Sequence, residues 1–237
     1  MYYYDMAGNL LDVDKENMSF LNNGECARVL HDGNIIFKEY YSATEPDYRL
    51  NTKMYKTLKD INNPHFIKLL NVYSQMNMFD LIKYKTGISK FHIDAYTALL
   101  YQDENVDIFE KDKAYLLDNL YELENLIDEF TNNSIIVDDL KRDNVTMDSN
   151  SIIIIDPDLF YFSDYAGEFI SKENKIKLLF LVEHILRRTA INHPNRREII
   201  GKINELIKMD VDSQTDITYE FSKKLSYTRK PIDYFVK

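Results

Sequence analysis

Two short runs of isoleucine and valine, separated by a polar loop, constrain this chain more than any other stretch. The runs are 135–137 and 152–155, and each leads directly into acidic residues. Short apolar runs bounded by turn residues predict buried strands, whereas polar side chains that follow such strands have no role in a core. Four of these side chains are candidates for chemistry: Asp139, Lys141, Asn144 and Asp156.

This set contains the groups that phosphoryl transfer requires. The Asp139 carboxylate can accept a proton, and the Lys141 ammonium can neutralise negative charge. The Asn144 amide and the Asp156 carboxylate offer oxygen ligands to Mg²⁺. Because phosphoryl transfer depends mostly on positioning and charge neutralisation, the stretch predicts a phosphotransferase site. The alternative interpretation is a surface turn followed by an ordinary strand.

The sequence Asp-Leu-Lys-Arg-Asp-Asn-Val at 139–145 resembles the catalytic loop of protein kinases, and Asp-Pro-Asp at 156–158 resembles their metal-binding Asp-Phe-Gly. The resemblance implies catalytic roles for Asp139 and Lys141, and metal binding by Asn144 and Asp156. There are two departures from the family pattern. Val-Asp at 137–138 replaces the usual His-Arg, and Pro-Asp at 157–158 replaces the usual Phe-Gly.

The N-terminal part resembles the nucleotide-binding lobe of such a kinase. Residues 18–21, 26–31 and 34–41 predict three strands of an antiparallel sheet, with Asp-Gly at 32–33 as a tight turn. Lys38 ends Ile-Ile-Phe-Lys where the family has Val-Ala-Ile-Lys, which implies that it binds the α- and β-phosphates of ATP. The turn before it aligns with the glycine-rich loop of the family, which implies that four more residues contact the cofactor: Asn22, Gly24, Ala27 and Val29.

The next segment predicts a helix that lacks an acid the family normally carries there. Apolar residues recur at helical spacing over 50–61, and Pro64 follows the end. Counting back from Pro64 by the family spacing reaches Met54, where protein kinases have the glutamate that pairs with the strand lysine. We therefore expect Met54 in the core and another partner for Lys38. The candidates for that partner are Asp156, Glu45 and Asp47.

Two further strands are predicted over 66–74 and 76–82. The resemblance then implies a hinge between lobes at 83–87, where backbone near Lys83 and Tyr84 would hold adenine.

The chain from residue 88 onward is expected to be mostly helical. The segment between Asp156 and the helix expected over 175–186 is short and lacks the Ala-Pro-Glu of protein kinases. In addition, Asp138 replaces the arginine that in protein kinases pairs with a phosphorylated activation segment. We therefore expect no activation by phosphorylation there. Apolar periodicity predicts four helices: 114–130, 175–186, 199–207 and 218–225.

Composition narrows the setting of this site. The 237-residue chain has a formal net charge of −10, which disfavours a nucleic acid or an anionic membrane as the main partner. Cys26 is the only cysteine, so no intramolecular disulfide can form, and the five histidines lack the spacing of a zinc site. The N-terminus predicts no signal peptide, and no run approaches a membrane span. We expect a cytoplasmic protein, with export through another type of signal left open.

Together these features predict an α+β, two-lobed protein kinase-like fold. An N-terminal lobe over 1–82, with an antiparallel sheet and one helix, would join a mostly helical lobe over 88–237 through the hinge at 83–87. ATP with Mg²⁺ or Mn²⁺ would bind between the lobes. The expected activity is phosphoryl transfer to a Ser/Thr hydroxyl of a protein by a small, bacterial-type kinase.

Three alternatives remain open. A small-molecule phosphotransferase similar to aminoglycoside and choline kinases is favoured by the short segment after Asp156, but Lys141 is unusual for that group. A pseudokinase that binds nucleotide or scaffolds a partner is favoured by the incomplete glycine loop, but the four intact polar residues of the central stretch oppose it. Transfer of another group, such as a nucleotide, is the third alternative.

Overall fold

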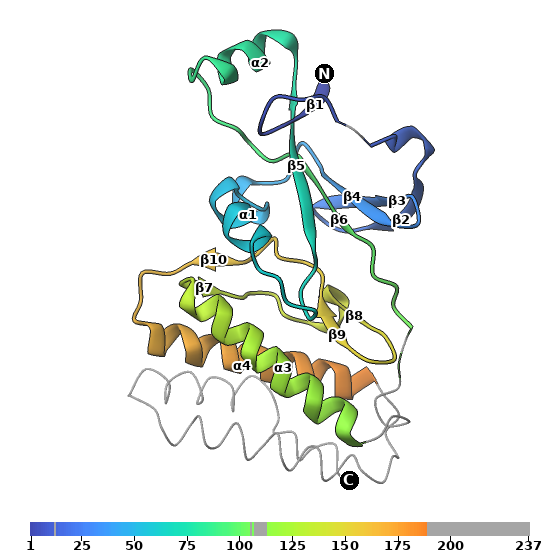
Figure 1. Ribbon diagram of the computed structural model, residues 1–237, viewed down its shortest axis with the longest axis vertical. Coiled ribbons are helices and arrows are strands. Elements are labelled where there is room, and N and C mark those ends of the chain that lie inside the picture. Colours follow the sequence, from blue (N-terminus) through green and yellow to red (C-terminus); the bar gives the residue numbers. More distant parts are fainter. Residues whose placement is uncertain (12, 105, 107–112, 189–237) are drawn as a thin grey trace. The chain divides into compact units, whose positions relative to one another are not determined.

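The computed structural model describes residues 1–188 apart from residues 12, 105 and 107–112. The described chain is α+β and divides into two compact units (Figure 1). The first unit comprises residues 1–102 and 153–162, and the second comprises the described residues of 103–152 and 163–188. The first unit therefore continues beyond the boundary predicted at residue 82, and it also takes in the segment that carries Asp156.

The first unit is built on a six-stranded antiparallel sheet with the order β1-β5-β6-β4-β3-β2. The strands predicted over 18–21, 26–31 and 34–41 are confirmed as β2, β3 and β4, and the strand predicted over 66–74 is confirmed as β5. The bounds are β1 Tyr2–Asp5, β2 Ser19–Asn23, β3 Ala27–His31, β4 Ile35–Tyr40, β5 Leu69–Met76 and β6 Ala95–Leu99.

The two faces of strand β4 have different neighbours, because side chains alternate along a strand. Phe37 packs on one side, and its ring meets the Tyr3 ring edge-on at a centroid distance of 5.5 Å. Lys38 and Tyr40 lie on the other side, where Tyr96 of β6 is the cross-strand partner of Lys38. A cation is thus placed among aromatic rings in the middle of the sheet.

Helix α1 (Thr52–Lys59) follows the short 3₁₀ turn η2 (Pro46–Tyr48) and confirms the helix predicted over 50–61. The Asn51 side chain accepts a hydrogen bond from the Met54 backbone N–H at 2.9 Å, which caps the first turn. Met54 is 0% exposed, as expected from its position on the apolar face of the helix. The helix contains no acidic residue.

The strand predicted over 76–82 is wrong, because Met78–Lys85 forms helix α2. Periodicity alone does not show whether a short apolar run forms a helix or a strand. Here Asn77 decides, since its side chain accepts a hydrogen bond from the Asp80 backbone N–H at 2.9 Å and begins a helix. Residues 83–87 are the last turn of α2 and the turn after it, and they lie inside the first unit rather than between the units.

The helical prediction for the chain after residue 88 is wrong over Ala95–Leu99, which forms β6. Strand β6 pairs with β4 on one side and β5 on the other, and four of its five residues are buried. A central strand covered on both faces shows little polar alternation, so its pattern does not separate it from a buried helix.

Two long helices, α3 (Lys113–Asn132) and α4 (Gly167–Arg188), pack against each other and against strand β7 (Ile135–Ile136) in the second unit. They confirm the helices predicted over 114–130 and 175–186. The helices predicted over 199–207 and 218–225 lie outside the described residues. The remaining elements are η3 Arg142–Asn144, β8 Val145–Met147, β9 Ile152–Ile154, β10 Tyr161–Phe162 and the early 3₁₀ turn η1 Lys15–Asn17.

Within the described ranges, no helix combines the length and the apolar character needed to cross a bilayer.

Glu39 of β4 forms an ionic cluster whose effect on stability can be tested. Its carboxylate accepts hydrogen bonds from Tyr3, Lys15 and Arg28. Burial acts to raise the pKa of Glu39, but these donors together hold the pKa below its ordinary value of 4.5. A depressed folded-state pKa adds stability above pH 4.5, and that stability is lost as the pH falls through the folded-state pKa.

We therefore expect Glu39→Gln to lower the free energy of unfolding at pH 7 and to weaken its decline below pH 4.5. Urea denaturation of the parent and the variant across this pH range measures both effects. Glu16→Gln is the matched control, because Glu16 is exposed on η1. An unchanged pH profile in Glu39→Gln would contradict the assignment.

Candidate active site

Within the first unit, backbone and ring contacts join the segment that carries Asp156 to Phe66 and Ile67. The Ile67 N–H donates to the Ile154 carbonyl at 2.8 Å, and Ile154 forms a parallel bridge with Phe66. Further along the segment, the Phe160 ring stacks on the Phe66 ring at a centroid distance of 6.3 Å. These contacts bring the turn at 156–158 to β4 even though more than a hundred residues separate them in sequence.

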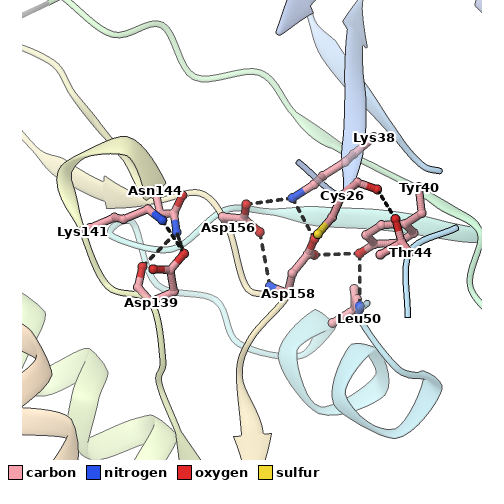
Figure 2. Close-up of polar contacts among 10 residues, drawn as sticks. All are labelled: Cys26, Lys38, Tyr40, Thr44, Leu50, Asp139, Lys141, Asn144, Asp156 and Asp158. Atoms are coloured by element: carbon pink, nitrogen blue, oxygen red, sulfur yellow. Dashed lines mark hydrogen bonds and ion pairs between the residues drawn. The ribbon is translucent and has the colours of Figure 1, made fainter. Parts of the chain in front are cut away.

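Lys38 forms ion pairs with two carboxylates of that turn (Figure 2). Its Nζ lies 2.7 Å from Asp156 Oδ2 and 2.9 Å from Asp158 Oδ2, and its side chain is 11% exposed. Burial acts to lower the pKa of Lys38, but Tyr96, Asp158 and Asp156 outweigh it and hold the pKa well above its ordinary value. The ammonium is therefore a permanent charge in this cluster.

Tyr40 extends the cluster toward helix α1. Its hydroxyl donates to Asp158 Oδ1 at 2.7 Å and accepts from the Leu50 backbone N–H at 3.1 Å. The Asp158 N–H donates to Asp156 Oδ1 at 3.2 Å. Burial and the neighbouring Asp156 charge raise the pKa of Asp158 to about 6, against the opposing effects of Lys38 and Tyr40.

The prediction that Lys38 pairs with an acidic residue outside helix α1 is confirmed. Helix α1 supplies no glutamate, and Lys38 pairs with Asp156, one of the three acids predicted for this role. The other two candidates, Glu45 and Asp47, lie exposed at η2. From the sequence, the carboxylate at 158, where the family has glycine, was considered only as a second metal ligand, and its pairing with Lys38 was missed.

Tyr40 was missed as well. It lies two residues after Lys38 on the same strand, so strand alternation already places both side chains on one face. An aromatic hydroxyl beside a buried lysine is a candidate hydrogen-bonding partner for any carboxylate that neutralises the lysine.

The turn predicted to bind phosphate is a tight hairpin. The Gly24 N–H donates to the Ala27 carbonyl at 2.9 Å, which closes a turn over residues 25 and 26. The Gly24 φ is not in the left-handed region, and a Cβ there would only touch the Ala27 carbonyl at 3.5 Å. Asn22 is exposed, Ala27 is buried and Val29 is half-buried. Cofactor binding by this turn stays a prediction.

Lys83 and Tyr84 make their contacts away from Lys38. The Tyr84 hydroxyl donates to the Met6 carbonyl at 2.6 Å, and its ring packs against Phe91. The Lys83 Nζ lies 4.2 Å from the centroid of the Phe79 ring on the same helix. These contacts belong to the packing of α2, so they lend no support to adenine binding at this position.

The second unit holds the predicted catalytic loop. Asp139 Oδ2 lies 2.8 Å from Lys141 Nζ and accepts a hydrogen bond from Asn144 Nδ2 at 2.9 Å (Figure 2). Asn144 Nδ2 also donates to the Asp139 carbonyl at 2.8 Å. Asp139 has a φ of +53°, a left-handed conformation that aspartate adopts more readily than most residues. Three of the four residues predicted from the central stretch therefore form one hydrogen-bonded group.

Helix α4 holds this loop in place through Asn174, which is 0% exposed. Its side chain accepts from the Val137 N–H at 2.9 Å and donates to the Ile135 carbonyl at 2.8 Å. Lys177 of the same helix pairs with Asp138 at 2.6 Å. A buried amide that satisfies two backbone groups fixes the strand, and with it the start of the loop.

Asp156 in the first unit and Asn144 in the second each offer an oxygen of the kind that Mg²⁺ prefers. Among the described residues, no three His, Cys, Asp or Glu side chains form a group that could hold a metal. Mg²⁺ needs fewer, because one or two protein oxygens with substrate phosphates and waters complete its shell. Asp156 is 29% exposed, and the contacts of Asn144 with Asp139 use its amide nitrogen and leave its amide oxygen unused by them.

Comparison with models of known protein families finds no family that matches this chain, and comparison with curated proteins finds no match. The functional interpretation therefore rests on the two residue groups described above.

Proposed function

We propose that the protein is an ATP- and Mg²⁺-dependent phosphotransferase of the protein kinase-like type, with a Ser/Thr hydroxyl of a protein as acceptor and the cytoplasm as its place of action. The observation that carries the proposal is the pairing of Lys38 on β4 with Asp156 after β9. Kinases carry the phosphate-binding lysine and the metal-binding aspartate at corresponding positions. A chance sequence resemblance would not be expected to bring these two residues into contact.

The order of elements in the first unit supports the same proposal. Lys38 lies on the third strand of the β2-β3-β4 meander, after the Gly24 turn, and helix α1 follows that strand. Protein kinases place their glycine-rich loop, their lysine strand and the following helix in this sequence.

The chemistry assigned to each residue follows from its charge and contacts. Lys38 would hold the α- and β-phosphates, and Asp156 with Asn144 would hold the metal ion, which neutralises charge on the phosphates. Asp139 would accept the proton of the acceptor hydroxyl, and Lys141, at 2.8 Å from the Asp139 carboxylate, would neutralise charge on the transferring group.

A nucleotide-binding pseudokinase is the second candidate. The tight hairpin at Gly24 and the double pairing of Lys38 favour it, because both would have to rearrange to admit phosphates. Phosphoryl transfer ranks first because Lys141 and Asn144 both donate to the Asp139 carboxylate.

Labelled ATP separates these functions. The purified protein is incubated with γ-labelled or α-labelled ATP, with Mg²⁺ or Mn²⁺, and label is sought on the protein itself and on lysate proteins. Label from the γ position alone supports the proposed phosphotransferase. Label from the α position indicates nucleotide transfer, and ATP binding without any label indicates a pseudokinase.

Asp156→Ala is expected to abolish the metal-dependent part of thermal stabilisation by ATP. Removing a carboxylate leaves phosphate charge without its metal, whereas the protein stays folded because Lys38 keeps Asp158 at 2.9 Å. Thermal unfolding with ATP, with and without Mg²⁺, measures the effect. Asp164→Ala serves as control, since Asp164 is exposed. Equal stabilisation of Asp156→Ala and the parent would remove Asp156 from the site.

A further inference from the structure

The buried carboxylate of Asp158 contacts both Lys38 and the hydroxyl of Tyr40. The resemblance to protein kinases assigns no role to Asp158 or Tyr40. We propose that these two residues position Lys38 for the phosphates of ATP, in place of the missing helix glutamate, and so leave Asp156 available to the metal. This inference rests on the proposed function, because it assigns a role within the same site.

The two carboxylates beside Lys38 are not equivalent. Asp158 is 10% exposed and uses both oxygens within the cluster, one with Tyr40 and one with Lys38. Asp156 is 29% exposed, and its Oδ1 accepts a longer bond, of 3.2 Å, from a backbone N–H within the same turn. The buried carboxylate is therefore the fixed anchor of the lysine, and the more exposed one is suited to exchange Lys38 for a metal ion.

Tyr40 connects this anchor to helix α1. A tyrosine hydroxyl can donate and accept at once, and here it donates to Asp158 and accepts from the Leu50 N–H just before the helix begins. Polar contacts thus run from the start of α1 through Tyr40 and Asp158 to the Lys38 ammonium (Figure 2). In protein kinases an ion pair between this helix and the lysine makes the same connection.

The prediction is a selective loss of ATP affinity. Asp158→Asn keeps the shape but removes the charge that holds the ammonium, and hydrogen bonds to charged groups are among the stronger ones. We expect the dissociation constant for Mg·ATP to rise about tenfold in Asp158→Asn, and by a smaller factor in Tyr40→Phe. Asp158→Glu should recover part of the affinity.

Tyr55→Phe is the matched control. Tyr55 is also a buried tyrosine of the first unit, but its hydroxyl donates to the Leu70 carbonyl at 3.1 Å and has no part in the Lys38 cluster. Isothermal titration calorimetry of Mg·ATP compares the four variants, and circular dichroism confirms that each is folded.

A double-mutant cycle distinguishes positioning from a structural effect. If Asp158 acts through Lys38, adding Asp158→Asn to Lys38→Met should weaken ATP binding no further than Lys38→Met alone. Additive losses, or unchanged affinity in Asp158→Asn and Tyr40→Phe, would overturn the positioning role while the parent still binds ATP and transfers label. A parent that binds no ATP would overturn both this inference and the proposed function.

Discussion

Asp139→Asn is expected to lower the rate of phosphoryl transfer about a hundredfold or more and to leave ATP affinity unchanged. Asparagine preserves the shape of the side chain but cannot accept the proton of the acceptor hydroxyl. The Asp139 carboxylate lies among donors, with Lys141 Nζ at 2.8 Å and Asn144 Nδ2 at 2.9 Å, so these two contacts fix its orientation. Steady-state kinetics with labelled ATP measures turnover, and calorimetry measures affinity.

Asp143→Asn in the same loop is the control for this prediction, because it removes one negative charge at a residue with no assigned role. It should retain activity close to that of the parent. If Asp139→Asn keeps full activity, the base must lie elsewhere, with Asp143 or Asp138 as the nearest candidates. Asp138 is the weaker of the two, since Lys177 already pairs with it at 2.6 Å.

Lys38→Ala is expected to destabilise the protein by about 3–5 kcal/mol in addition to weakening ATP binding, because it leaves a carboxylate buried without its cation. Asp158 is the group concerned, since its Oδ2 lies 2.9 Å from Lys38 Nζ in a buried setting. Urea denaturation measures the loss of stability. A fluorescent ATP analogue measures affinity at a temperature where the variant remains folded.

Met54→Leu is the companion to this variant. Met54 is fully buried on α1, and a swap that conserves volume in a core usually costs less than about 1.5 kcal/mol. It should therefore change neither stability nor ATP affinity by much. Full stability together with full activity in Lys38→Ala would contradict the ion-pair assignment and weaken the kinase-like interpretation of the first unit.

Local sequence was sufficient to predict the elements whose residue pattern is typical of one type of secondary structure. The strand carrying Lys38 and the helix carrying Met54 were predicted from alternation and helical period, which depend on residues close together in the chain. Asp139, Lys141 and Asn144 were singled out by the resemblance of 139–145 to a catalytic loop, and they contact one another through Asp139. The resemblance, through its spacing back from Pro64, led to the expectation that α1 gives Lys38 no acidic partner, and the pairing of Lys38 with Asp156 was among the predicted outcomes.

Long-range contacts determined the rest. Helix α2 is specified by the Asn77 cap, and strand β6 is specified by its pairing with β4 and β5. The apolar pattern of either run does not distinguish a helix from a strand. Asp158 pairs with Tyr40, from which it is 118 positions distant in the sequence, and with Lys38, which lies two positions further away. Such a pair forms because burying a charge requires a partner, and the identity of that partner depends on how the segment carrying Asp158 is held against the sheet.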